Sequence, residues 1–178
     1  MCSDSMLSFL SRDNCVLHSS YLEKARLKYS ILEKSFVELK GKCAKDVLKM
    51  RLSRELKAEA LHLLSEIESH ELFFASFAER NNKCELIRKY YSSEESFLYE
   101  IYEKALKALG DFLYICLDTR GKPTIATNSK LFELYPRLEP KLCLDLCEHS
   151  YFMDYGFERE EYLRAAISHL DLIKLLNT

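Results

Sequence analysis

Residues 141–155 read KLCLDLCEHSYFMDY, and this stretch decides the fold. Leucine alternates with other residues from position 142 to position 147, which is the period-two pattern of a β-strand. Asp145 therefore points away from the leucines, and His149 follows just beyond the expected end of the strand. Carboxylate and imidazole groups suit Mn, Fe or Zn, so these two side chains could share one metal ion. Alone, a D-x-x-x-H pair is a weak indication of a metal site.

The longer segment 145–163, DLCEHSYFMDYGFEREEYL, resembles the C-terminal signature of the iron/manganese superoxide dismutases, D-x-W-E-H-A-Y-x-x-D-Y followed by R-x-x-Y-L. The residues in register are Asp145, Glu148, His149, Tyr151, Asp154, Tyr155, Arg159, Tyr162 and Leu163. The match departs at Cys147, where the family has a tryptophan lining the metal site, and at Phe152, where the catalysts usually carry a tyrosine. The resemblance implies a Mn or Fe ion and the conversion of superoxide to oxygen and hydrogen peroxide.

Composition indicates an ordinary globular protein. The chain has 178 residues, 48% of them hydrophobic, and a net charge of −2 at pH 7 with both signs interspersed. A net charge of this size predicts no long-range attraction to nucleic acid or to an anionic membrane, so we expect no partner of either kind. No apolar run approaches the ~20 residues of a membrane-spanning helix.

Cysteine usage favours a reducing compartment. The chain has seven cysteines, an odd number, and none of them forms a C-x-x-C pair. This pattern predicts reduced, mostly buried thiols and not a disulfide framework or a zinc ribbon. The first 15 residues lack a basic start and a cleavage-like site, so we expect a cytoplasmic protein.

The first part of the chain is predicted to be a helical hairpin. Ser20 and Glu23 have the spacing of a capping box, which predicts a helix from Ser20 to about position 40. A second amphipathic segment covers 45–78 and is expected to break near Ser53. Two long helices joined by a short connection make an antiparallel pair.

The remainder is predicted to be a small sheet covered by helices. After a linker at 81–83, a capping box of Ser92 and Glu95 predicts a helix that ends at Gly110. The segments that follow are expected to form strands at 111–118, 123–129 and 142–147 and a helix at 159–176. We therefore expect an α+β fold: an N-terminal α-helical hairpin domain over 1–82 and a C-terminal α/β domain with a three-stranded antiparallel sheet over 83–178.

Four metal ligands are implied by the resemblance, namely two histidines from the helical domain and an aspartate and a histidine from the C-terminal domain. His70, in SHELFF, resembles the ligand in the family's N-H-x-x-F/Y-W helix, so His70, Asp145 and His149 match three of the four. Aligning YLEKA with the family's T-L-E-x-H places Ala25 at the position of the lost fourth ligand. His18 lies seven residues earlier, ahead of the expected helix, and could substitute only if that segment folds back.

The surroundings of the metal are also altered. Relative to Ala25, the family's gateway histidine and tyrosine fall four and eight residues later, at Tyr29 and Glu33, and its glutamine falls at Glu66 or Ser129. The residues expected around the ligands are thus Glu148, Cys147, Glu66, Tyr29 and Phe152. Groups around the ligands orient them and supply protons, so these changes predict weak or lost dismutation. In the family the glutamate at Glu148 crosses a dimer interface, which predicts a homodimer through the Glu148 and His149 region.

Three functions are compatible with these observations. The first is a divergent dismutase with a partial site of three ligands and weak or no activity, and the second is an active dismutase with a rebuilt site. The third is a metal-free structural or interaction module with a protein partner, as in the dismutase-like subunits of mitochondrial ribosomes. In that case the three residues would form only a polar cluster between the domains.

Overall fold

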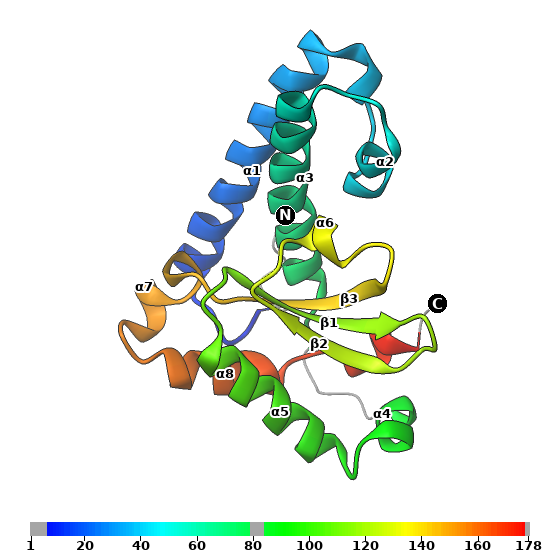
Figure 1. The fold of residues 1–178 in the computed structure, drawn as a ribbon. Helices are drawn as coiled ribbons and strands as arrows, with labels where there is room; N and C mark the ends of the chain where they lie inside the picture. The colour runs from blue at the N-terminus through cyan, green and yellow to red at the C-terminus, as the bar shows by residue number, and fades with distance from the viewer. Residues whose placement is uncertain (1–6, 79–83, 177–178) are drawn as a thin grey trace.

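The computed structural model describes residues 7–78 and 84–176 (Figure 1). Its first part is the predicted hairpin, in which two long helices pack side by side. The elements are α1 (Arg12–Ser35), η1 (Val37–Leu39), α2 (Ala44–Lys49) and α3 (Arg54–Ala75). The predicted break near Ser53 is confirmed, because Ser53 is the N-cap of α3 and its hydroxyl accepts a hydrogen bond from the Leu56 amide at 3.2 Å.

The start of α1 differs from the prediction. Ser11, and not Ser20, is the N-cap, and its hydroxyl accepts from the Asn14 amide at 3.2 Å. Ser20 lies inside the helix, where its hydroxyl donates to the Leu17 carbonyl at 2.6 Å. A serine within a helix can bond a carbonyl one turn earlier, so a capping-box spacing does not by itself mark the first turn. As a result, His18 lies in the second turn of α1 and not in a preceding loop.

The second part contains the three-stranded antiparallel sheet that the sequence predicts, with strand order β2-β1-β3. The elements are α4 (Glu85–Tyr90), α5 (Glu94–Lys107), β1 (Phe112–Asp118), β2 (Pro123–Thr127), α6 (Leu131–Leu134), β3 (Leu138–Asp145), η2 (Glu148–Ser150), α7 (Phe152–Tyr155), α8 (Arg159–Ser168) and η3 (Leu172–Leu175). The turn between β1 and β2 requires Gly121, whose φ is +74°. Helix α4 was not predicted.

Several element ends differ from the expected ones. Strand β3 ends at Asp145, two residues short of Cys147, and its last four residues are all buried because the sheet is covered on both faces. Helix α5 begins after Ser93, which pairs with Ser96 as a capping box, and ends at Lys107. The final helix is divided, since α8 ends before His169 and η3 follows as a separate turn.

Two hydrophobic clusters lie next to each other. The smaller fills the hairpin between α1, α2 and α3, and the larger joins the sheet to α5, α8 and the lower end of α3. In Figure 1 the hairpin extends from one side of the sheet, while α5 and α8 lie on the other side. The lower end of the hairpin therefore meets the end of β3, which brings the candidate ligands together. The expected domain boundary at 82/83 lies outside the described residues and stays a prediction.

Candidate metal centre

Four side chains from four elements converge below the hairpin: His18 from α1, His70 from α3, Asp145 from the end of β3 and His149 from η2. One potential ligand atom of each lies within 4.8 Å of those of the others. Asp145 Oδ2 is 2.9 Å from His18 Nε2, 3.2 Å from His149 Nε2 and 3.8 Å from His70 Nε2. The structure thus brings together the three ligands expected from the sequence and adds His18.

The backbone around Asp145 fixes which oxygen faces the histidines. Asp145 Oδ1 accepts a hydrogen bond from the Cys147 amide at 2.8 Å. The main-chain oxygen of Asp145 accepts from the Tyr162 hydroxyl at 2.7 Å. Because Oδ1 and the carbonyl are engaged, Oδ2 is the oxygen directed at the three imidazoles.

The orientation of His70 is fixed within α3. Its Nδ1 lies 2.7 Å from the Glu66 carbonyl oxygen, one turn earlier. A carbonyl oxygen only accepts hydrogen bonds, so Nδ1 carries the proton, and in the neutral ring Nε2 presents its lone pair toward Asp145. This is the tautomer that a metal-binding imidazole needs when its other nitrogen is anchored.

Burial and mutual contact shift the pKa values of this cluster. His18, His70 and Asp145 are buried, and the His149 side chain is 19% exposed. Burial would raise the pKa of Asp145, but its contacts with His149 and His18 hold that pKa below its ordinary value. Burial lowers the pKa of His18, whereas Asp145 raises the pKa of His149 against the effect of burial. The carboxylate is therefore ionised and His18 is held neutral.

The donor set fits a metal ion. Three imidazole nitrogens and one carboxylate oxygen suit Mn, Fe or Zn. His70 Nε2 and His149 Nε2 are buried and have no hydrogen-bond partner within the described part of the chain. Buried polar atoms are nearly always satisfied in native proteins, and a cation between these nitrogens and Oδ2 would satisfy them.

The assignment of Ala25 as the lost-ligand position is wrong. Ala25 lies on α1 two turns beyond His18, about 10 Å further along the helix axis. It packs against the hairpin core, away from the cluster. The error came from starting the helix at Ser20, which excluded His18 from α1. The signal that could have corrected it is Ser11, a residue of the N-cap type that lies about two turns before His18.

Tyr29 is also not at the site. Its hydroxyl donates to the Leu39 carbonyl at 3.1 Å, near the far end of the hairpin. Counted from His18, the same offsets of four and eight residues reach Leu22 and Arg26. Leu22 is a buried apolar residue, and Arg26 pairs with carboxylates on both helices. Neither position carries the histidine or tyrosine expected from the resemblance.

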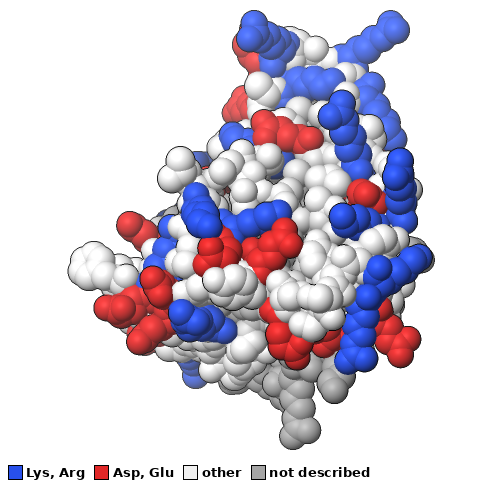
Figure 2. Space-filling view, turned by 60° about the horizontal axis from the view of Figure 1, so that its bottom comes forward, with Lys and Arg blue, Asp and Glu red and all other residues white. Residues whose placement is uncertain are grey.

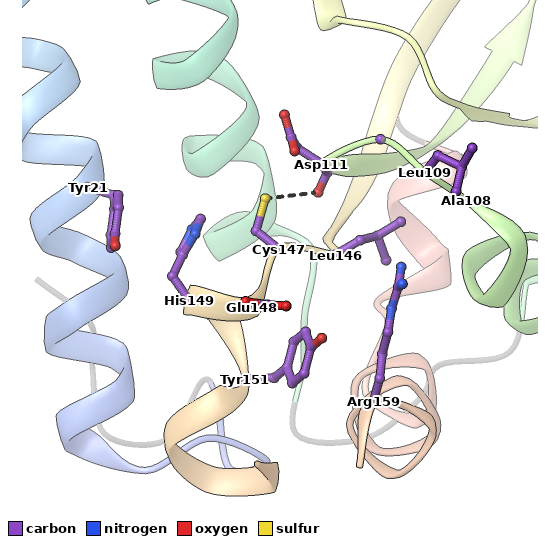
Figure 3. A pocket seen from close by; sticks show the side chains of 11 residues that line it. Tyr21, Ala108, Leu109, Asp111, Leu146, Cys147, Glu148, His149, Tyr151 and Arg159 are labelled. Carbon is purple, nitrogen blue, oxygen red and sulfur yellow. Dashed lines mark hydrogen bonds between the residues drawn. The ribbon is translucent and has the colours of Figure 1, made fainter. Parts of the chain in front are cut away.

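Tyr21 lies against the cluster and was not predicted. Its ring stacks on His149 with centroids 4.2 Å apart and an interplanar angle of 21°. Both rings line an open cavity of about 590 Å³, which Cys147 and Arg159 also line (Figure 3). Burial, together with nearby acidic groups, raises the pKa of Cys147, so this residue is a neutral thiol whose Sγ lies 3.9 Å from the Asp111 carbonyl.

The other residues expected around the ligands lie in three places. Glu66 lines a separate pocket of about 260 Å³, which Ser129 also lines. Glu148 is exposed and lines the cavity beside His149. Phe152 is exposed on α7, where its ring contacts that of Phe157 with centroids 5.4 Å apart.

Comparison with known proteins agrees with this geometry. The family model described as iron/manganese superoxide dismutases, C-terminal domain, matches residues 79–175, more than half of the chain. The chain belongs to the iron/manganese superoxide dismutase family. It is 24% identical over 160 residues to a superoxide dismutase [Mn/Fe] of Rickettsia typhi, covering 86% of this chain and 74% of that protein. It is also 24% identical over 115 residues to the chloroplastic superoxide dismutase [Fe] 3 of Arabidopsis thaliana, covering 60% of this chain and 44% of that protein. The clustered three histidines and one aspartate are the residue types that the resemblance implies for the family's metal site.

Proposed function

We propose that His18, His70, Asp145 and His149 bind one Mn or Fe ion, and that the protein converts superoxide to oxygen and hydrogen peroxide slowly. The observation that carries this proposal is the convergence of three imidazole nitrogens on one buried carboxylate oxygen. Four protein ligands replace the partial, three-ligand site expected from the sequence. Family membership supports the choice of Mn or Fe over Zn.

The chain's residues have distinct parts in this proposal. A bound Mn or Fe ion would supply a redox couple that takes an electron from one superoxide and returns it to another. The Asp145 carboxylate would offset part of the ion's positive charge. The hydrogen bond from His70 Nδ1 to the Glu66 carbonyl leaves His70 Nε2 free to bind the ion. Tyr21 covers His149 from the cavity side. Arg159 lines the same cavity and would attract a small anion.

Proton supply is the reason to expect slow turnover. Formation of hydrogen peroxide needs two protons from groups within hydrogen-bond reach. Leu22 has no proton to give, and the Arg26 guanidinium is held between Glu23 and Glu71. The raised pKa of Cys147 makes it a poor acid. We therefore expect the metal-loaded protein to show dismutase activity far below that of a typical family member in a superoxide consumption assay.

The test of metal binding is elemental analysis of protein expressed in cells supplemented with Mn and Fe. We expect close to one ion per chain for the wild type and a large loss for His18→Ala. The matched control is His62→Ala, since His62 is exposed and lies outside the cluster. Equal metal content in all three proteins would contradict the assignment of His18.

A metal-free module with a protein partner is a second candidate, and one observation favours it. His18 Nε2 and Asp145 Oδ2 lie 2.9 Å apart, at hydrogen-bond distance, so these two side chains hold each other without an ion. Wild-type protein that stays free of Mn and Fe under metal supplementation would support this candidate and exclude the first.

A homodimer through Glu148 and His149 is part of the proposal. Glu148 is exposed beside His149, and Phe152 and Met153 add exposed apolar surface just beyond it. In a twofold dimer, Glu148 would reach the partner's His149 and orient its ring. Light scattering should give a dimer for the wild type and weakened association for Glu148→Ala, and a monomeric wild type at micromolar concentration would refute it.

A cytoplasmic location also stays a proposal. The free thiols of Cys43, Cys84, Cys116, Cys143 and Cys147 support a reducing compartment.

A further inference from the structure

The positive charge of the protein is concentrated at one end of the molecule. Residues 34–54, which form the end of the hairpin, contain seven Lys or Arg and two Asp or Glu, a net charge of +5. Because the whole chain carries −2, all other residues together carry −7. Figure 2 shows the basic side chains gathered around the end of the hairpin, with fewer acidic ones among them. The small net charge thus conceals a strongly basic tip.

The basic side chains of this tip face solvent, although one of them, Lys45, also lies over the ring of Tyr135 at 4.9 Å from its centroid. All seven are exposed, namely Lys34, Lys40, Lys42, Lys45, Lys49, Arg51 and Arg54. In the described part of the chain none of them forms an ion pair, whereas Lys104 and Lys107 of α5 pair with glutamates at 2.8 and 2.7 Å. Unpaired charges of one sign repel each other, and an anionic surface would relieve that repulsion.

An exposed apolar stripe runs along α1 into the same tip. Leu27 is 63% exposed and Ile31, one helical turn later, is 57% exposed. Phe36 and Val37 continue the stripe at 38% and 75% exposure. Lys28 and Lys34 flank the stripe on the helix. Exposed aliphatic groups flanked by lysine are typical of helices that lie in the interface of an anionic membrane.

We propose that the tip of the hairpin, residues 34–54, together with Leu27 and Ile31 of α1, binds the surface of an anionic phospholipid bilayer. Lysine and arginine near such a surface each contribute about 1 kcal/mol through attraction to lipid phosphate and carboxylate groups. The side chains of Val37, Ile31 and Leu27 would move out of water into the boundary between the lipid headgroups and the acyl chains. None of the described helices is long and apolar enough to cross a membrane.

Two other occupants fit this surface less well. A second copy docked face to face would bring one basic tip against another, and like charges oppose that contact. A nucleic acid would match the charge, but three of the four side chains of the stripe, Leu27, Ile31 and Val37, are aliphatic, and only Phe36 has a ring on which a base could stack. Residue 34, where the tip begins, lies about 24 Å along α1 from His18, so membrane binding would be independent of the metal site.

Vesicle flotation with the full chain tests the proposal. We expect the protein to float with vesicles of phosphatidylcholine containing ~30 mol% phosphatidylserine at ~0.1 M salt, and not with phosphatidylcholine alone. The variant Lys34→Glu/Lys40→Glu should reduce the bound fraction at least tenfold, and Val37→Ser should reduce it severalfold. The matched control is Arg120→Glu/Lys122→Glu in the exposed β1–β2 turn, which should bind like the wild type. Circular dichroism melts confirm that each variant folds.

Three results would overturn the proposal. The first is no flotation with anionic vesicles, and the second is equal loss of binding in the tip and turn variants, which would indicate a nonspecific charge effect. The third is tight binding of a single-stranded or double-stranded oligonucleotide that depends on Lys34 and Lys40 while vesicles are not bound. That result would assign the tip to nucleic acid.

Discussion

The two halves of the candidate metal centre are built differently. Asp145 and His149 come from one short segment, where a strand end leads directly into η2. Asp145 accepts hydrogen bonds from the Cys147 amide, two residues away, and from the Tyr162 hydroxyl of α8, 17 residues away. His18 and His70 come from two separate helices, and their approach depends on how α1 and α3 pack. The C-terminal half is therefore fixed by contacts within residues 145–162, and the N-terminal half by the packing of helices that are far from it in the sequence.

Substitution of Asp145, which lies close to the histidines of both halves, is expected to have the largest effect on metal affinity. Asp145→Asn removes the charged oxygen that lies within 3.8 Å of all three histidines, so we expect metal affinity to fall on the order of a thousandfold. Competition with a metal chelator measures the change. Asp111→Asn, beside the open cavity but outside the cluster, should stay within about twofold of the wild type.

The second-largest effect should come from pH: a lower pH should weaken metal binding. Histidine must lose its proton to bind a metal, and Asp145 raises the pKa of His149 above its ordinary value. Metal affinity should therefore rise with pH through ~6.5 and continue to rise until His149 is fully deprotonated, by up to tenfold per pH unit for each proton displaced. Manganese titrations between pH 5.5 and 8 would show this slope, and an affinity independent of pH would exclude imidazole ligands.

A smaller effect on metal affinity should distinguish the two helix caps, Ser11 and Ser53, which lie at opposite ends of the hairpin. Ser11 and Ser53 are both N-caps, and Ser→Ala at either should cost about 1 kcal/mol of stability. Only Ser11 lies near a candidate ligand, about two turns before His18, so only Ser11→Ala should also weaken metal binding, by a few fold. Thermal melts and chelator competition measure the two quantities. Equal metal affinity in both variants would show that the start of α1 does not position His18.

Local chemistry explains what the sequence predicted well. The break before α3 was predictable because Ser53 supplies its own cap, and the β1–β2 hairpin because Gly121 permits the left-handed turn. Asp145 and His149 were recognisable since the motif is contiguous. In each case the determining contacts lie within a few residues of each other.

Tertiary contacts explain what the sequence did not predict. The spacing of Ser20 and Glu23 satisfies a capping box, yet α1 continues through it because an earlier cap at Ser11 is available. That cap is supported by Asp154, which accepts from the Ser11 amide at 2.8 Å across a long stretch of sequence. The stacking of Tyr21 on His149 depends on the same packing. No local pattern could have placed Tyr21 at the site, and the sequence offered Ser11 and Ser20 as two possible starts of the helix that carries His18.

The most direct test of the central claim is to count the imidazoles bound to manganese by pulsed electron paramagnetic resonance. We expect nitrogen couplings from three histidines in the wild type and from two in His18→Gln. Ala25→His should leave the count at three and the metal affinity unchanged, since position 25 lies about 10 Å beyond His18 along α1. Couplings from two histidines in the wild type, rising to three in Ala25→His, would contradict the assignment of His18 as a ligand and would make Ala25 the position of the lost ligand.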